Sequence, residues 1–213
     1  YRTSLFGKTH LHPHAGDLRQ REDLMASYGL DDVDEIGGPR ASARVLSHMT
    51  ARWEKKGKWE AYRADFSERF ANRPHVVRAS TLGLEDYADT YVGERGQQYL
   101  QAYDRPEPWC CWISFGRPHE PWDAPDYYTR LYMPDYDGEI VQPPYCRWED
   151  APNFTAEKVR KAHATYCGEI TMVDAWVGHL LRKVENMGLM EKTAIIFTSD
   201  HGFYFGEHGG RVG

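Results

Sequence analysis

The stretch from Leu84 to Trp122, "LEDYADTYVGERGQQYLQAYDRPEPWCCWISFGRPHEPW", holds a helix, a strand and a polar cluster in succession. Its first half predicts a helix that Pro106 and Pro108 end, and "WCCWISF" has the aromatic and apolar residues typical of a strand. The polar residues 116–119 follow directly. In α/β proteins ligands bind at the carboxyl ends of the strands, so this order indicates an α/β fold with a candidate site after the strand.

The same order occurs at the end of the chain. The segment "TAEKVRKAHATYCGEITMVDAWVGHLLRKVENMG", residues 155–188, has apolar residues at three- and four-residue spacing and predicts a long amphipathic helix. Thr155 can cap its start and Gly188 can end it. The apolar run Ala194–Phe197 then predicts a core strand, which is followed by Asp200 and His201.

A third apolar run, "TSLF" at residues 3–6, is followed at once by the polar residues Gly7-Lys8-Thr9-His10. Three predicted strands thus end in polar side chains, and we expect these side chains to share one pocket. Residues from about 17 to 75 are charged and aromatic, with helices predicted near 19–28, 41–56 and 60–71. We interpret this segment as a helical insertion or lid.

The composition of the chain limits the classes of function that it can have. With 213 residues, of which 41% are hydrophobic, the chain can bury a core as one domain or two small ones. The net charge of -6 argues against a nucleic-acid partner, since phosphate-rich surfaces are normally met by basic patches. The sequence has no apolar run long enough to predict a membrane span, and its four cysteines form neither a disulfide framework nor a C-x-x-C zinc spacing.

Lys8 and His10 lie two residues apart in an extended segment, so both side chains can face one side. An ammonium group beside an imidazole suits an oxyanion, although two solvated side chains would show the same spacing. The series His10, His12 and His14 is similar to an alternation of zinc ligands. Because Pro13 interrupts it and no carboxylate is close in the sequence, we do not expect a separate zinc site there.

His119 lies between Pro118 and Glu120-Pro121, so its backbone is stiffened on both sides. It can act as a general acid, or it can simply pack on Trp122. Asp200 and His201 are adjacent, and a turn at Gly202 would bring both onto one metal ion; the alternative is a cap with a surface imidazole. The aromatic residues of "RWEKKGKWEAY", 52–62, either stack on sugar rings or form helix core.

Together these motifs resemble the sulfatase family of the alkaline phosphatase superfamily. The segment from Tyr1 to His10 resembles the second sulfatase signature, "RPHEPWDAPDYY" at 117–128 resembles the segment with the active-site histidine, and "IIFTSDHGFYFGEHG" at 195–209 resembles the metal-binding strand end. The resemblance implies an alkaline-phosphatase-like mixed sheet flanked by helices. It identifies residues 1–213 as a partial sulfatase catalytic domain, incomplete at both ends.

By this resemblance, Lys8 and His10 would hold the nucleophile and the sulfate oxygens, and His119 would bind sulfate and assist departure of the alcohol. Asp200 and His201 would ligate a divalent ion, which in the family is usually calcium. A histidine ligand is softer than calcium prefers, so manganese, magnesium and zinc stay open. The implied substrate is a sulfate ester of a small molecule or a carbohydrate.

The sequence departs from the family pattern at the nucleophile. The family uses a cysteine matured to formylglycine, or a serine, in a C/S-x-P-x-R motif, and this motif does not occur here. The N-terminal pair of metal-binding aspartates is missing as well. We therefore expect the nucleophile to lie outside this chain and the chain alone to be inactive. Alternatives are a phosphonate monoester or phosphodiester hydrolase of the same superfamily, or a non-catalytic module that binds an anionic glycan.

Overall fold

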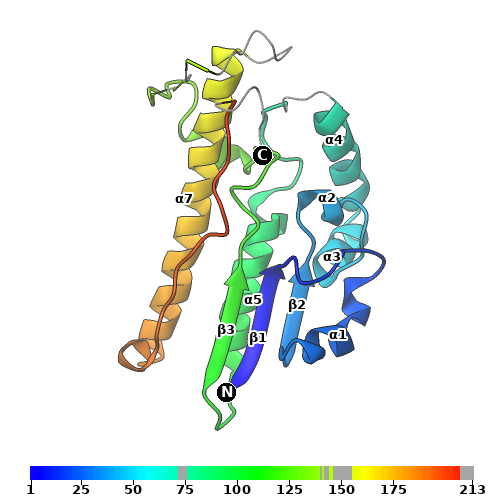
Figure 1. Cartoon of the computed structure of the whole chain (residues 1–213), viewed down its shortest axis with the longest axis vertical. Helices are drawn as coiled ribbons and strands as arrows, with labels where there is room; N and C mark the ends of the chain where they lie inside the picture. Colours follow the sequence, from blue (N-terminus) through cyan, green and yellow to red (C-terminus); the bar gives the residue numbers. More distant parts are fainter. Residues whose placement is uncertain (72–75, 140, 142–143, 146–154, 207–213) are drawn as a thin grey trace.

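Three parallel strands form the sheet of the computed structural model, which describes all residues except 72–75, 140, 142–143, 146–154 and 207–213 (Figure 1). Strand β1 (Arg2–Lys8) lies at the centre, between β2 (Asp32–Ile36) and β3 (Trp109–Ser114). Both strands predicted from residues 3–6 and from "WCCWISF" are therefore present. Their parallel arrangement brings the carboxyl ends of all three strands to one edge of the sheet.

Gly7 allows β1 and β3 to approach closely at this edge. It pairs with Glu35 on β2 and with Ser114 on β3, and its backbone has a φ of +119°. A Cβ atom at this position would lie only 1.9 Å from the carbonyl oxygen of Ser114. Only glycine fits such a backbone without moving a strand.

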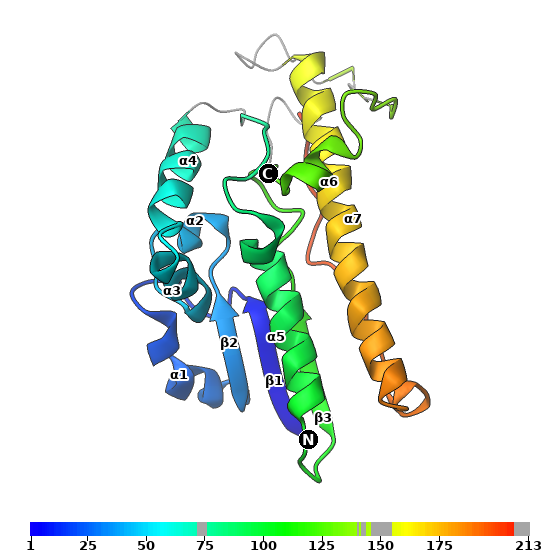
Figure 2. The same ribbon diagram turned by 180° about the vertical axis from the view of Figure 1, so that it is seen from behind.

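Two long helices cover one face of the sheet (Figure 2). Helix α5 (Ala88–Ala102) packs on β1 and β3, and α7 (Ala156–Asn186) packs on α5. The start of α7 is capped as predicted, because the Thr155 hydroxyl accepts a hydrogen bond of 3.2 Å from the backbone N–H of Lys158. Among the described residues, no helix is both long and apolar enough to cross a bilayer.

The remaining helices are shorter, and most of them lie between β1 and α5 in the sequence. They are α1 (Glu22–Ser27), α2 (Pro39–Ser42), α3 (His48–Lys55), α4 (Trp59–Ala71) and α6 (Asp126–Arg130), with 3-10 turns η1 (Leu18–Gln20), η2 (Leu84–Asp86) and η4 (Met190–Lys192). The main core joins α3, α4, α5 and α7 to the end of β2. Trp53 and Tyr62 belong to this core, with exposed fractions of 1% and 5%, so neither offers a face to a sugar ring.

The segment from about 17 to 75 is not wholly helical, in contrast to our expectation. It contributes β2, which pairs with β1 and so forms part of the central layer. The strand was missed because its sequence, "DVDEI", buries two carboxylates, Asp34 and Glu35, with exposed fractions of 3% and 5%. Both have polar partners, which hydrophobic patterning does not reveal. A role of this segment as a lid stays a prediction.

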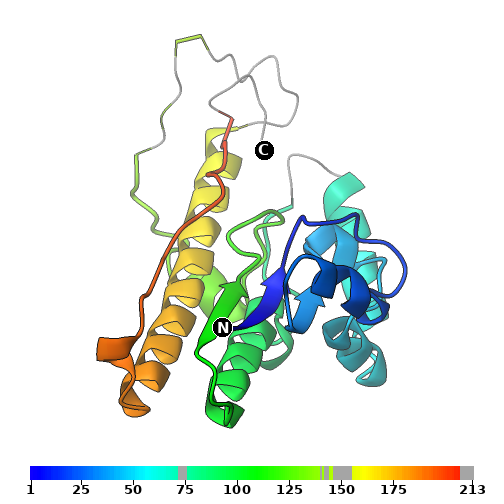
Figure 3. The same ribbon diagram turned by 60° about the horizontal axis from the view of Figure 1, so that its bottom comes forward.

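The run Ala194–Phe197 is not a strand, and this prediction was wrong. Ile196 and Phe197 are 88% and 80% exposed, and within the described part of the chain no backbone hydrogen bond joins residues 194–199 to the sheet. Apolar composition alone cannot supply the ladder of backbone hydrogen bonds that a strand needs. The chain instead runs along α7 (Figures 1 and 3) until Phe205 packs on Trp122, with ring centroids 5.1 Å apart.

Candidate functional site

Lys8 is the last residue of β1 and presents a half-buried ammonium group at the carboxyl edge of the sheet. Its side chain lies against the turn after β2, where a Cβ atom on Gly38 would be 3.7 Å from Nζ. Burial lowers the pKa of Lys8, and the Asp200 and Asp89 carboxylates partly oppose this shift. Within the described residues Nζ makes no hydrogen bond or ion pair, so the charge is available to an anionic ligand.

His119 lies in the loop after β3, with its ring near the edge of Phe203 at a centroid distance of 5.4 Å. Its Nδ1 is 2.7 Å from the backbone carbonyl oxygen of Glu120. This contact is favourable when Nδ1 carries the proton, which leaves Nε2 for a ligand. Burial lowers the pKa of His119 and the Lys8 ammonium lowers it further, so the two side chains lie within electrostatic reach of each other.

His10 lies two residues beyond β1 and is exposed. Its ring stacks on that of His14 with centroids 6.2 Å apart. The pKa of His10 is lowered by burial and then by the charges of Lys8 and His14, whereas Asp200 acts to raise it. His10 is thus electrostatically coupled to both Lys8 and Asp200.

Asp200 and His201 lie on an exposed turn, and their geometry fits two ligands of one metal ion. His201 Nδ1 is 2.8 Å from the carbonyl oxygen of Gly202, which favours a proton there and leaves Nε2 free. Nε2 lies 3.6 Å from Asp200 Oδ2. A tetrahedral ion with bonds of about 2.1 Å separates its ligands by about 3.4 Å, so small movements would let one ion contact both atoms.

The pKa of Asp200 is lowered, which favours the charged form that a metal requires. Burial is the largest single influence and acts to raise this pKa. The hydrogen bond from the backbone N–H of His201 and the charges of His201 and Lys8 outweigh it. Lys8, His10, His119 and Asp200 are therefore linked by their charges, while their roles in binding or catalysis stay predictions.

Arg117 holds the loop that carries His119, a role that sequence reasoning did not identify. Its guanidinium group is only 4% exposed. Nη1 donates hydrogen bonds of 2.5 Å to the carbonyl oxygens of His119 and Pro121, and Nη2 donates one of 2.5 Å to Asp123 Oδ1. These bonds fix the backbone on both sides of the histidine.

Three buried carboxyl groups surround Arg117 and tie the loop to both long helices. Asp89 on α5 accepts hydrogen bonds from the backbone N–H groups of Gly116, at 2.7 Å, and Arg117, at 3.1 Å. Glu169 on α7 accepts one of 3.0 Å from the backbone N–H of Asp123. Burial raises the pKa of all three carboxyls against the opposing effect of the Arg117 charge. An acidic residue on the buried face of a predicted helix is the sequence signal that would have revealed Asp89 and Glu169.

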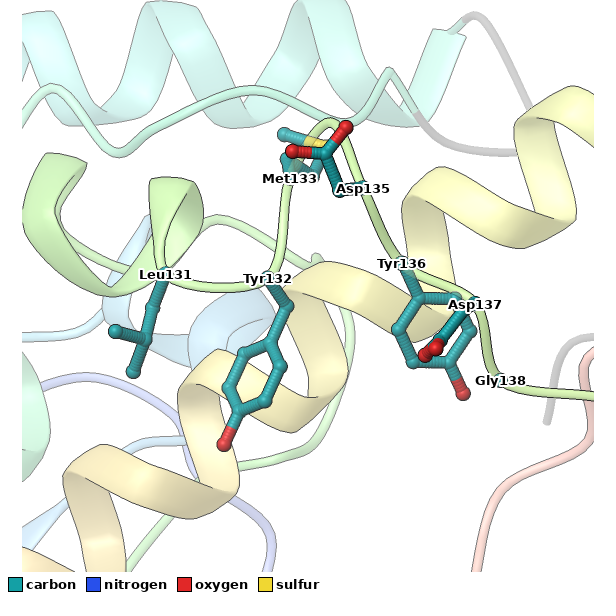
Figure 4. Close-up of a pocket in the computed structure, with 7 residues that line it drawn as sticks. All are labelled: Leu131, Tyr132, Met133, Asp135, Tyr136, Asp137 and Gly138. Atoms are coloured by element: carbon teal, nitrogen blue, oxygen red, sulfur yellow. The ribbon is translucent and has the colours of Figure 1, made fainter.

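A hollow of about 310 Å³ follows α6, lined by residues 131–138 (Figure 4). Its wall includes Tyr132, whose hydroxyl lies 2.8 Å from Thr171 Oγ1 on α7. None of the predicted site residues lines this hollow. The hollow also lacks basic groups, so we assign the candidate site to the edge of the sheet.

Comparison with known families identifies the family of this chain. The profile of the Sulfatase family matches residues 1–212. The chain belongs to the sulfatase family. The resemblance of the three motifs is thereby confirmed, and members of the sulfatase family generally bind a divalent metal ion.

Curated relatives share part of this chain. An arylsulfatase of Clostridium perfringens is 29% identical over 129 residues, which cover 55% of this chain and 27% of that protein. A choline-sulfatase of Rhizobium meliloti is 33% identical over 116 residues, which cover 48% of this chain and 23% of that protein. The chain spans about a quarter of the length of these relatives.

A solved structure, the phosphonate monoester hydrolase of Agrobacterium radiobacter, resembles this fold with a TM-score of 0.65 and 20% sequence identity. The likeness covers all of this chain and 47% of that one. At this identity it shows the fold alone. The predicted alkaline-phosphatase-like α/β class is confirmed, with the three described strands all parallel.

Proposed function

We propose that the protein is a metal-dependent hydrolase of sulfate esters, with small-molecule and carbohydrate esters as the candidate substrates. The observation that carries this proposal is the half-buried Lys8 ammonium, which has no ion-pair partner among the described residues and is coupled by charge to His119 and Asp200. Membership of the sulfatase family supports the same reaction class.

In this proposal Lys8 attracts the sulfate oxygens and Asp200 and His201 hold the divalent ion. Calcium is the usual ion of the family, and the imidazole ligand keeps manganese, magnesium and zinc open. When bound, the ion supplies Lewis acidity and neutralises negative charge on the ester. Lys8 adds a fixed positive charge, whose half-buried setting strengthens its attraction for an anion.

His119 is the proposed general acid. Its lowered pKa means that the imidazole is largely neutral before substrate binds. A bound sulfate ester adds negative charge beside the ring, which raises the pKa and favours protonation at Nε2. As the nucleophile forms a bond to sulfur and the bond between sulfur and the ester oxygen breaks, the Nε2 proton moves to that oxygen and the alcohol leaves in neutral form.

The nucleophile is the part that these residues do not supply. No cysteine or serine stands in a C/S-x-P-x-R motif in the sequence. We propose that a segment outside this sequence provides a matured cysteine or a serine. His10, which is coupled by charge to Lys8, would then assist in holding that group.

Hydrolysis of phosphonate monoesters or phosphodiesters is the second candidate, because the structural neighbour is a phosphonate monoester hydrolase. Both reactions need a cation and a tetrahedral anion at one edge of the sheet. The sulfate monoester, the phosphonate monoester and the phosphodiester each carry one negative charge, and they differ in the central atom and its substituents. Rates on matched substrates distinguish the two reactions.

The test uses the protein together with the segment proposed to supply the nucleophile, because we expect the 213-residue chain alone to be inactive. This intact protein is compared with its Lys8→Met variant on an aryl sulfate and on the matching aryl phosphonate monoester. We expect the sulfate to be the better substrate and Lys8→Met to lower kcat/KM by at least about 100-fold, the usual effect of removing one group that stabilises a transition state. Lys192→Met, which changes an exposed lysine, is the matched control. Faster phosphonate hydrolysis would favour the second candidate, and an unchanged rate in Lys8→Met would reject both.

A further inference from the structure

A second cluster of metal-ligating groups lies beside the candidate site. His12 and His14, in the loop after β1, both face Glu35 near the end of β2. Nε2 of His12 lies 2.8 Å from Glu35 Oε2, and Nε2 of His14 lies 3.1 Å from Oε1. One ligand atom from each residue lies within 4.8 Å of the other two. The three side chains are only 5%, 7% and 2% exposed.

We propose that His12, His14 and Glu35 form a zinc site that is separate from Asp200 and His201. Two imidazole nitrogens and one carboxylate oxygen are the protein ligands of many three-ligand zinc sites, and a water molecule completes the tetrahedron. Calcium is a poor match because it takes six to eight oxygen ligands. This set offers one carboxylate and two nitrogens.

The hydrogen bonds of His12 favour a cation between its ring and Glu35. Its Nδ1 lies 3.1 Å from the carbonyl oxygen of Pro13, an acceptor, while Nε2 faces the carboxylate. A neutral imidazole has a single N–H, so it can donate to only one of these two acceptors. With the proton on Nδ1, Nε2 directs a lone pair at the carboxylate, and a metal ion between them turns this repulsion into two bonds.

Outer contacts already orient the carboxylate. The hydroxyl of Thr9 donates a short hydrogen bond to Glu35 Oε1. Hydrogen bonds of this kind to ligating carboxylates and imidazoles are typical of the second shell of metal sites.

The geometry needs little adjustment to hold zinc. Ligand atoms bound tetrahedrally at about 2.1 Å lie about 3.4 Å apart. The observed separations of 2.8 and 3.1 Å from the two ring nitrogens to Glu35 are slightly shorter. Small rotations of the side chains would open the space for the ion without moving β2.

The proposal departs from the expectation from the sequence, in which the alternation of His10, His12 and His14 had no carboxylate nearby. The carboxylate comes from Glu35, which the pairing of β1 with β2 places beside the loop. Because His10 stacks on His14, zinc at this cluster would fix the loop that carries His10 next to Lys8. The inferred ion therefore has a structural role beside the site of the proposed reaction.

Zinc titration of the intact, metal-stripped protein against a chromophoric chelator tests the proposal. We expect Asp200→Asn, which removes a ligand of the other metal site, to bind one zinc equivalent, and the wild type to bind one equivalent beyond any that Asp200 and His201 hold. Glu35→Gln and His14→Ala should each weaken zinc binding by at least about tenfold. Loss of a residue that only hydrogen-bonds to a metal ligand usually costs that much, and loss of a ligand should cost no less. His48→Ala, which removes an exposed histidine, is the matched control and should bind as the wild type does.

A second measurement does not depend on the folding of the ligand variants. Cobalt(II) added to the Asp200→Asn protein should give the visible absorption bands of a four-coordinate ion with nitrogen and oxygen ligands. The proposal is overturned if Asp200→Asn shows no zinc binding and no such bands, or if a folded Glu35→Gln protein binds zinc as tightly as the wild type. Neither readout uses hydrolysis, so each stands whether or not the protein cleaves sulfate esters.

Discussion

Replacing Arg117 with methionine should destabilise the protein strongly, because its guanidinium group is the cation among three buried carboxyl groups. Methionine fills much of the space of the arginine stem and avoids a large cavity. The variant loses the hydrogen bonds to the carbonyl oxygens of His119 and Pro121 and to Asp123 Oδ1, each 2.5 Å long. It also leaves Glu169, whose Oε1 lies 3.6 Å from Arg117 Nη1, without a nearby positive charge.

The size of the expected loss of stability follows from these contacts. A buried acceptor left without its donor costs about 1–3 kcal/mol, and three acceptors lose their donor here. Part of this cost is relieved because the carboxyl groups can take up protons. Breaking a buried ion pair by removing one partner costs about 3–5 kcal/mol in other proteins, and we expect a loss of stability in this range.

Urea unfolding monitored by tryptophan fluorescence measures the change in the free energy of unfolding, with Arg130→Met as the matched control. Arg130 forms an exposed pair with Asp126 on α6, where the side chains are 75% and 62% exposed. Its removal should change the free energy of unfolding by less than about 0.5 kcal/mol. If Arg117→Met costs less than about 1 kcal/mol, or no more than the control, the network does not hold the His119 loop as described.

Three further outcomes follow from the same structure. Gly7→Ala should lower the free energy of unfolding by at least about 3 kcal/mol. The alanine Cβ would lie 1.9 Å from the Ser114 carbonyl oxygen, in a backbone with φ of +119°. An unchanged midpoint in urea unfolding would contradict this prediction. Burial raises the pKa of Glu169 well above its usual range, so this group stabilises the fold at low pH and the contribution is lost as pH rises through the folded pKa. The stability of the wild type relative to Glu169→Gln should therefore increase as pH falls, and thermal unfolding from pH 8 to pH 5 that showed the opposite trend would refute the assignment. Because the pKa of His119 in the free protein is lowered by burial, kcat/KM for an aryl sulfate should fall as pH rises through a value below 6.5, whereas a profile that rises through this range would exclude the protonated ring as the acid.

The long helix α7 shows how much hydrophobic periodicity can predict. It predicted the extent of α7 with its cap at Thr155, but not the phase of the buried face. Ile170, an apolar residue of this helix, is 44% exposed, while the neighbouring Glu169 is fully buried. The buried face of α7 includes small and polar residues, among them Glu169 beside Arg117, and a count of apolar residues does not register them.

The strands show the same limit of local sequence patterns, because one strand was missed and another was wrongly predicted. The strand β2 was missed because Asp34 is buried with hydrogen bonds from Tyr91 Oη, at 2.8 Å, and Arg95 Nε, at 2.7 Å, and both donors are distant in the sequence. The run Ala194–Phe197 was overpredicted because its apolar residues had no strand to pair with in the described part of the chain. Strand pairing is a long-range property that local composition does not encode.

The candidate site residues stay predictions, and the fold bears on them through their charges. We selected Lys8, His119 and Asp200 because polar residues follow predicted strands. In the fold Lys8 is coupled by charge to both His119 and Asp200. The buried partners of His119 and the carboxylate beside His12 were not found. They come from helices and from β2, and no short motif connects them to the histidines.

A double-mutant cycle on hydrolysis tests most directly whether Lys8 and His119 act on one bound ester. The measurement is kcat/KM on an aryl sulfate for the intact protein, Lys8→Met, His119→Asn and the double variant. Groups that act together on one transition state are non-additive, so we predict that the loss in the double variant falls at least about 1 kcal/mol short of the sum of the single losses. Losses that add to within about 0.3–0.5 kcal/mol, as expected for independent sites, would contradict a shared site.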